Sequence, residues 1–125
     1  MKKTPDLTKA EYDILRVLWK HGEKSVREVH DSLRHSQGWA LTTVRTMMDR
    51  MERKKLLSRK DSGGVYVYRP MISRPEGLTK MVRFFADRVL ETDTNTVVAM
   101  FSGGKGLTAD EIEELKKLLD REESE

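Results

Sequence analysis

The chain has 125 residues, no cysteine, and 24 Lys and Arg against 21 Asp and Glu, a formal net charge of +3. This length suits one ordinary domain with an extension, and the missing cysteines exclude disulfides, thiolate metal sites and cysteine nucleophiles. The apolar runs are too short to span a membrane, and no apolar stretch follows the two N-terminal lysines. We therefore expect a soluble cytoplasmic protein without a secretory signal.

The charge is divided unevenly along the chain. Residues 1–90 carry 20 Lys and Arg and 11 Asp and Glu, a balance of +9, whereas residues 91–125 carry 4 and 10, a balance of −6. This asymmetry favours a basic portion that meets a polyanion and an acidic portion with another role, although two solvated surfaces would give the same numbers.

Two helices are predicted at the start of the chain, each opened by a capping box. Thr8 and Glu11 form the first box, and the helix behind them ends at His21-Gly22. Ser25 and Glu28 form the second box, and the shorter helix behind them ends in the stretch RHSQGWA. Apolar residues recur at helical spacing in both segments.

A third helix is predicted to begin near Thr42, and a hairpin follows it. The helix carries an apolar stripe of Leu41, Val44, Met48 and Met51. The stretch LLSRKDSGGVYVYRP places short apolar segments on both sides of a turn that contains Gly63 and Gly64, which predicts a hairpin. Three short helices and a hairpin predict a mainly α fold with a small β-hairpin, a winged helix-turn-helix domain within residues 1–72.

The remaining residues, 73–125, are predicted to be helical, with broad apolar faces and little of their own to cover them. One helix ends at Val89, a second begins at Thr94 or Thr96, and a capping box at Thr108 opens the last. Because such faces are usually buried on another copy of the chain, this region is predicted to dimerise. The predicted dimerisation residues are Phe85, Val89, Val97, Val98, Phe101, Ile112, Leu115, Leu118 and Leu119.

The third helix and the hairpin concentrate positive charge. From Arg45 to Lys60 there are seven basic residues and two acidic ones, a local excess of +5. A helix that enters the major groove of DNA needs an anchoring apolar face, short polar side chains near its start and exposed cations. The predicted DNA-binding residues are Thr42, Thr43, Arg45, Thr46, Arg50, Arg53, Lys54, Arg59 and Lys60.

These residues have different expected roles. The threonines can approach phosphates or base edges, and Arg45 can donate two parallel hydrogen bonds to a guanine. The other basic residues supply phosphate contacts, which add affinity without reading sequence. Thr42 is as readily the N-cap of its helix, and the basic helix end could be a solvated terminus favoured by the helix dipole. Tyr66 and Tyr68 share a face of the second strand, and Trp39 is expected to pack in the core.

Four stretches carry a resemblance to a known family: ILRVLW in the first helix, TTVRTMMDRMERKKLL in the third, YRP in the hairpin and the C-terminal VVAMFSGGKGLTADEIEELKKLLD. They resemble the penicillinase-repressor (BlaI/MecI/CopY) family of winged-helix transcriptional regulators. The resemblance covers nearly the whole chain. It implies a homodimer that binds a palindromic DNA operator and represses transcription.

The resemblance also implies how such a repressor is released. In the resistance branch of the family, a membrane-bound sensor protease acts indirectly and the C-terminal segment is cut after an asparagine; the matching bond here joins Met100 and Phe101. In the copper branch a cysteine cluster binds the metal, and this chain has no cysteine. The candidate cleavage site is therefore Met100–Phe101, and the inducing signal stays open.

We expect neither an enzyme nor a cofactor. The three histidines, His21, His30 and His35, lack metal-ligand spacing, and SGGKGLT lacks the spacing of a phosphate-binding loop. The alternative function is a winged-helix module that docks a protein or binds RNA without operator recognition. Docking modules tend to lack a basic helix face, and RNA binders more often carry aromatic residues on an open sheet.

Overall fold

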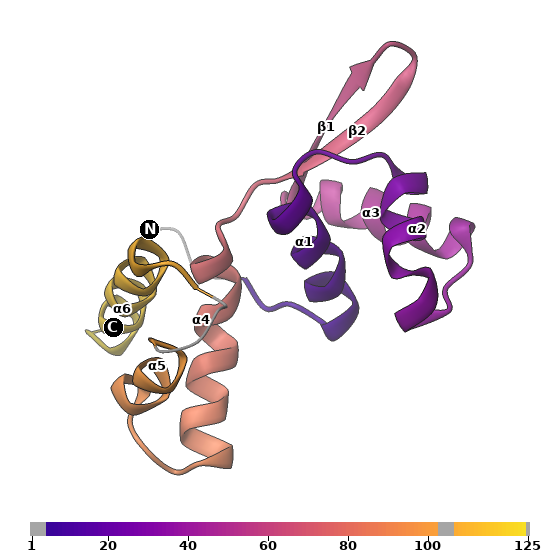
Figure 1. Cartoon of the computed structure of the whole chain (residues 1–125). Helices are drawn as coiled ribbons and strands as arrows, with labels where there is room; N and C mark the ends of the chain where they lie inside the picture. Colours follow the sequence, from indigo (N-terminus) through magenta and orange to yellow (C-terminus); the bar gives the residue numbers. More distant parts are fainter. Residues whose placement is uncertain (1–4, 103–106, 125) are drawn as a thin grey trace. The chain divides into compact units, whose positions relative to one another are not determined.

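The computed structural model describes residues 5–102 and 107–124, which form two compact units (Figure 1). The N-terminal unit is Leu7–Ser73, and the C-terminal unit is Arg74–Glu125 with the residues before Leu7. The N-terminal unit contains α1 (Lys9–His21), α2 (Val26–Gln37), α3 (Leu41–Arg53), β1 (Leu57–Ser62) and β2 (Val65–Pro70). The C-terminal unit contains α4 (Arg74–Phe84), the π-helix η1 (Phe85–Val89), α5 (Thr94–Ser102) and α6 (Ala109–Ser124).

The predicted capping boxes begin α1 and α2. The Thr8 hydroxyl accepts a hydrogen bond from the Glu11 N–H at 3.1 Å, and the Glu11 carboxylate accepts one from the Thr8 N–H at 3.0 Å. Ser25 and Glu28 make the same reciprocal pair at 3.2 and 2.9 Å. Both boxes satisfy N–H groups that have no partner inside the helix. These two predictions are confirmed.

The start of α3 differs from the prediction. The helix begins at Leu41, its N-cap is Ala40, and no side chain accepts a capping hydrogen bond there. Alanine has no side-chain acceptor, so the chain leaves this terminus without the side-chain cap that α1 and α2 have. The interpretation of Thr42 as the N-cap is therefore wrong: Thr42 lies in the first turn of α3 and its side chain is exposed.

The hairpin has the predicted strands and turn. β1 and β2 pair antiparallel in a register that runs from Leu57 opposite Pro70 to Ser62 opposite Val65. Gly63 and Gly64 form the connection with φ values of 64° and 90°, which glycine adopts without the steric penalty of a side chain. Figure 1 shows this hairpin extending away from the three helices of its unit.

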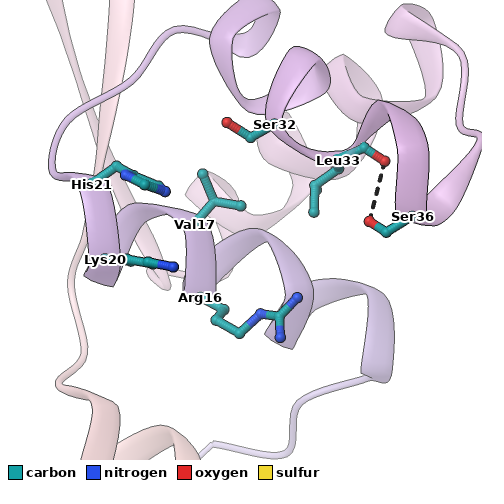
Figure 2. A pocket seen from close by; sticks show the side chains of 7 residues that line it. All are labelled: Arg16, Val17, Lys20, His21, Ser32, Leu33 and Ser36. Carbon is teal, nitrogen blue, oxygen red and sulfur yellow. Dashed lines mark hydrogen bonds between the residues drawn. The ribbon is translucent and has the colours of Figure 1, made fainter. Parts of the chain in front are cut away.

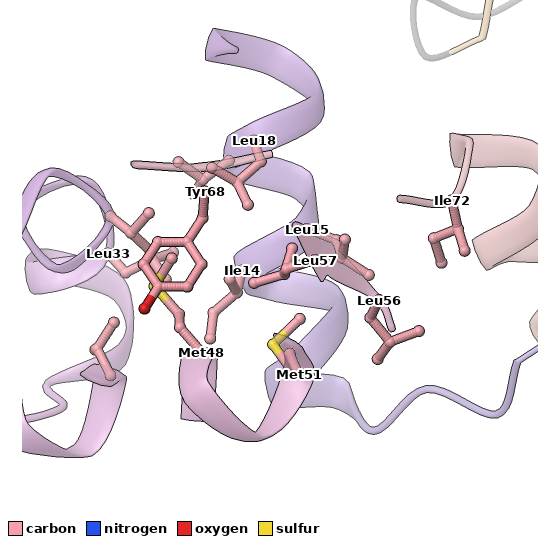
Figure 3. Close-up of a cluster of buried hydrophobic side chains, with 13 residues drawn as sticks. Ile14, Leu15, Leu18, Leu33, Met48, Met51, Leu56, Leu57, Tyr68 and Ile72 are labelled. Atoms are coloured by element: carbon pink, nitrogen blue, oxygen red, sulfur yellow. The ribbon is translucent and has the colours of Figure 1, made fainter. Parts of the chain in front are cut away.

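One apolar core holds the N-terminal unit together (Figure 3). Its buried members come from all three helices and both strands: Ile14, Leu15, Val17, Leu18, Val29, Leu33, Val44, Met48, Met51, Leu56, Leu57, Tyr68 and Ile72. Trp19 packs against this core and donates its indole N–H to the Ile72 carbonyl at 2.9 Å, and Trp39 is also partly buried against it. The expectation that Trp39 packs in the core is therefore confirmed.

The C-terminal unit has a core of its own. Val82, Ala86, Val97, Val98, Leu115 and Leu119 are buried there, from α4, η1, α5 and α6. The helices thus cover part of their apolar faces within one chain, contrary to the expectation that they have little of their own to cover them. The predicted helix to Val89 is also not regular, because after Phe84 the chain winds as a π-helix whose Leu90 N–H donates to the Phe85 carbonyl.

The last two helices begin with side-chain caps. The Asp93 carboxylate accepts from the Thr96 N–H at 2.8 Å in the first turn of α5, which begins at Thr94. Thr108 and Glu111 form the predicted capping box before α6, with distances of 3.0 and 3.1 Å. The predicted opening of α6 is therefore confirmed.

A buried carboxylate ties α1 to the end of α3. Glu11 accepts a hydrogen bond from the Lys54 ammonium in addition to that from the Thr8 N–H. Burial alone would raise the pKa of Glu11, but the hydrogen bonds from Lys54 and Thr8 outweigh it and hold the pKa below its ordinary value of 4.5. A carboxylate with a lowered pKa stabilises the fold above that ordinary value, and the stabilisation is lost as the pH falls through the lower folded-state pKa.

We expect Glu11→Gln to reduce the loss of stability on acidification. The amide keeps the side-chain shape but does not titrate, so the contribution of Glu11 to the pH dependence disappears. Urea unfolding followed by circular dichroism at several pH values between 3 and 7 measures the change. The variant's free energy of unfolding should fall less steeply with acid than the parent's, and parallel curves would contradict the role assigned to Glu11.

Candidate nucleic-acid interface

The two sides of α3 differ in character. Val44, Met48 and Met51 are fully buried in the core. At 100° per residue, Thr42, Thr46 and Arg53 lie on the opposite side of the helix. The side of α3 that faces away from the core therefore carries short hydroxyl side chains and cations, as the sequence pattern predicts.

All nine predicted DNA-binding residues have exposed side chains. Seven lie on α3 or directly after it: Thr42, Thr43, Arg45, Thr46, Arg50, Arg53 and Lys54. The other two, Arg59 and Lys60, lie on β1. The structure thus places this set on one helix and the adjoining hairpin, but it does not leave every cation equally available.

Lys54 is engaged in a contact inside its unit. Its ammonium pairs with the buried Glu11 carboxylate, and Lys54 is the C-cap residue that directly follows α3. A phosphate contact by Lys54 would compete with this ion pair. Arg50 lies one turn before Lys54, and Arg53 lies one residue before it. Since Lys54 is engaged with Glu11, Arg50 and Arg53 are the better candidates for phosphate contacts.

Arg59 and Lys60 point to opposite faces of the hairpin, because neighbouring side chains on a strand alternate. The Arg59 guanidinium lies 4.4 Å from the centre of the Tyr66 ring, and its Nη1 is 3.9 Å from Oδ1 of Asp49 on α3. The Lys60 ammonium lies 3.3 Å from Glu23. Both cations were predicted to contact DNA from the hairpin, and the structure places them on opposite faces of it.

A groove of about 670 Å³ lies between α3 and the hairpin. It is lined by Ser25, Val26 and Arg27 at the start of α2, Arg45 and Asp49 on α3, and Arg59, Gly64, Val65, Tyr66 and Tyr68 on or beside the hairpin. Three arginines from three elements therefore border one groove. Arg27 was missed by the sequence reasoning, because only the fold brings the first turn of α2 beside α3 and the hairpin.

A second hollow, of about 270 Å³, lies between α1 and α2 and contains none of the predicted site residues (Figure 2). Arg16, Lys20 and His21 reach it from α1, and Ser32 and Ser36 from α2. The Ser36 hydroxyl donates to the Leu33 carbonyl at 3.4 Å. The N-terminal unit therefore has further cationic surface, formed by α1 and α2, around this hollow.

The predicted dimerisation residues whose side chains the structure describes, all except Phe101, fall into three groups. Val97, Val98, Leu115 and Leu119 are buried in the core of their own unit, Ile112 and Leu118 are half-buried, and Phe85 and Val89 are exposed. Phe84 and Leu90, at 61% and 40% exposure, join Phe85 and Val89 in a set that we call the apolar patch. The sequence reasoning missed Phe84 and Leu90, because it assumed a regular helical period where the chain forms a π-helix.

The candidate cleavage bond between Met100 and Phe101 lies in the last turn of α5. The side chains of Met100 and Phe101 are outside the part of the chain that the structure describes. Within residues 5–102 and 107–124, no helix is long and apolar enough to cross a bilayer. The same residues contain no group of three or more His, Asp or Glu side chains that could hold a metal ion.

Comparison with known proteins agrees with this geometry. The family model described as "Penicillinase repressor" matches residues 7–121. The chain belongs to the penicillinase repressor family. The resemblance seen in the sequence is thereby confirmed.

Relatives in the family align over nearly their full lengths. The penicillinase repressor of Bacillus licheniformis is 31% identical over 120 residues, which are 96% of this chain and 94% of that protein. The methicillin resistance regulatory protein MecI of Staphylococcus aureus is 24% identical over 119 residues, 95% of this chain and 97% of MecI.

Solved structures resemble part of this penicillinase repressor family member. The B. licheniformis BlaI monomeric form in complex with the blaP half-operator is 34% identical and superposes with a TM-score of 0.53. The match covers 61% of this chain and 93% of that one, and the DNA-binding domain of the repressor BlaI matches equally well. The predicted winged-helix fold is confirmed.

Proposed function

We propose that the protein is a cytoplasmic, sequence-specific DNA-binding transcriptional repressor. The observation that carries the proposal is the exposed side of α3, where threonines and arginines lie opposite the buried Val44, Met48 and Met51. Membership of the penicillinase repressor family and the likeness to BlaI on its half-operator support it. The residues expected to contact DNA can reach base edges, the thymine methyl group and backbone phosphates.

Arg45 is the candidate for reading a base. Its long side chain is exposed on the flank of α3 that borders the groove, and a guanidinium can donate two hydrogen bonds to the O6 and N7 atoms of guanine. Thr42, Thr43 and Thr46 can approach a phosphate or the thymine methyl group. Arg50 and Arg53 supply charge to phosphates, which raises affinity for every sequence.

The alternative is a winged-helix module that docks a protein or binds RNA. A docking module does not need several exposed cations on α3. An RNA binder more often stacks bases on several aromatic side chains of an open sheet. Here Tyr68 is buried, and the exposed Tyr66 already has the Arg59 guanidinium over its ring. Selection of bound fragments from random DNA duplexes tests the proposal, because it returns the preferred sequence, its symmetry and its spacing. Recovery of no duplex at modest salt would refute DNA recognition.

We expect Arg45→Ala to weaken binding to the selected duplex by about 1–3 kcal/mol and to relax the preference at one base pair of each half-site. Fluorescence anisotropy on the selected duplex and on single-base variants measures both effects. Arg16→Ala is the matched control, since it removes the same charge from the hollow between α1 and α2. Unchanged affinity and preference in Arg45→Ala would contradict base reading by this residue.

We expect Arg53→Ala to weaken binding to selected and unrelated duplexes alike. Loss of one phosphate contact should lower the slope of log K against log salt by about 0.9. Titrations at four or more salt concentrations measure the slope. Lys54→Ala serves as the comparison: it should also lower the midpoint of thermal unfolding because it removes the partner of buried Glu11, whereas Arg53→Ala should not. Equal slopes for the parent and Arg53→Ala would show that Arg53 makes no phosphate contact.

We also propose that the protein acts as a homodimer through its C-terminal unit. A palindromic operator requires two winged units, with recognition helices about 10 base pairs apart or a multiple of that spacing. The apolar patch of Phe84, Phe85, Val89 and Leu90 supports the proposal, because exposed apolar side chains gathered on one segment are typical of association surfaces. Release by cleavage near Met100–Phe101 through a membrane-bound sensor protease stays a prediction; cleavage there would require the last turn of α5 to open.

We expect Val89→Glu to convert the dimer into a folded monomer, because a charge in the apolar patch opposes its burial. Sedimentation velocity measures the mass, and circular dichroism measures the helix content. Lys117→Glu places the same side chain at an exposed position of α6 and should remain a dimer. Leu115→Glu should instead disrupt the C-terminal unit, since Leu115 is fully buried in its core. A Val89→Glu protein that sediments as a dimer would exclude the patch from the interface.

A further inference from the structure

Asp49 is an acidic residue among the cations of α3. It lies one helical turn from both Arg45 and Arg53, and it borders the groove between α3 and the hairpin. A carboxylate there repels a phosphate backbone and lowers the affinity of the surface for DNA. Its presence therefore calls for a role that offsets this repulsion.

Within the described part of the chain, the side-chain hydrogen bond and the ion pair of Asp49 are both with the hairpin. The Tyr68 hydroxyl donates to Oδ1 of Asp49 at 3.1 Å, and the Nη1 atom of Arg59 lies 3.9 Å from the same oxygen. Arg59 and Tyr68 are opposite each other in the ladder of β1 and β2, so one carboxylate oxygen meets a cross-strand pair. Arg59 also stacks over Tyr66, which keeps its guanidinium on this face of the hairpin.

Asp49 contacts Arg59 and Tyr68 near the base of the hairpin. A small change in the angle of the strands there moves the tip of the hairpin by a larger distance. Tyr68 is 2% exposed, and its backbone N–H and carbonyl form a two-way bridge with Lys24 at 2.8 and 3.2 Å. Burial raises the pKa of the Tyr68 hydroxyl, and donation to Asp49 adds to this against the opposing effect of Arg59. The hydroxyl therefore stays a donor at neutral pH. Gly64 lies roughly 13 Å along the strand at about 3.3 Å per residue.

We propose that Asp49 is a positioning residue that holds the hairpin at a set angle to α3, with Arg59 engaged in this contact rather than on a phosphate. The inference rests on the proposed function, because the angle of the hairpin matters for binding only if α3 and the hairpin meet DNA together. It revises the sequence-based role of Arg59, which was expected to contact the DNA backbone.

Whether Asp49→Ala raises or lowers the affinity for DNA distinguishes a positioning role from a purely electrostatic one. If Asp49 acted only through its charge, Asp49→Ala would bind DNA more tightly than the parent. As a positioning residue, its loss should weaken binding about tenfold, measured at a temperature at which circular dichroism shows the variant to be fully folded. Asp49→Asn retains an acceptor for the Tyr68 hydroxyl and should recover most of that loss.

Two further variants complete the binding experiment. Glu52→Ala removes the same charge from the same helix. Glu52 attracts Arg59 only through the weaker Coulombic effect and makes none of the described hydrogen bonds to the hairpin, so the affinity of Glu52→Ala should equal or exceed the parent's. Tyr68→Phe keeps the buried ring and removes only the hydroxyl, and it should weaken binding in the same direction. The Asp49→Ala, Tyr68→Phe double variant should bind no more weakly than Asp49→Ala, since both changes remove one contact.

The hairpin angle is measured without DNA. The chain has no cysteine, so Ser62→Cys at the end of β1 and Ser32→Cys on α2 can carry a pair of spin labels. Double electron–electron resonance should give a narrow distance distribution in the parent and a broader or shifted one in Asp49→Ala. Glu52→Ala should leave the distribution unchanged.

The outcomes are distinguishable. An unaltered distance distribution in Asp49→Ala, or binding equal to or tighter than the parent's, overturns the positioning role. Failure of the parent to bind any selected duplex refutes the proposed function instead, and the label distances then still decide whether Asp49 holds the hairpin. A broader distribution together with weaker binding supports the proposal.

Discussion

The packing of α3 on the core determines what its other side offers to a partner. Val44, Met48 and Met51 are fully buried, so α3 cannot turn about its axis without exposing apolar side chains. Burial of a side chain of this size contributes about 1.5–3 kcal/mol, so three of them oppose any rotation strongly. The threonines and arginines on the far side are held in a defined direction because the apolar side is anchored.

The hairpin depends on the same core through one residue. The Tyr68 ring belongs to the same buried core as Leu33, Met48 and Ile14 (Figure 3). Its backbone pairs with Lys24, and its hydroxyl donates to Asp49. The base of the hairpin is thus attached to the first two helices and to α3. The tip at Gly63-Gly64 is exposed, and the described sheet consists of these two strands. A rigid base with an exposed tip suits a hairpin that meets a ligand beside the helix.

The C-terminal unit divides its apolar residues between two tasks. Val97, Val98, Leu115 and Leu119 stabilise the unit itself, whereas the apolar patch around η1 remains exposed. A π-helix has more residues per turn than an α-helix. The side chains that follow it therefore point in other directions than a regular α-helix would give them. Folding of this unit and the proposed pairing of two chains therefore draw on different side chains, and mutations can affect one without the other.

The sequence by itself determined the features that depend on near neighbours in the chain. The capping boxes join residues three apart, the hairpin turn needs adjacent glycines, and the apolar period of α3 leaves its cations exposed, so each was predictable. Only the tertiary structure decided contacts between distant residues, such as Glu11 with Lys54, 43 residues apart, and Asp49 with Tyr68, 19 apart. These pairings change the roles of Lys54 and Arg59, and no local pattern indicates them, because they arise where the shared core brings separate elements together.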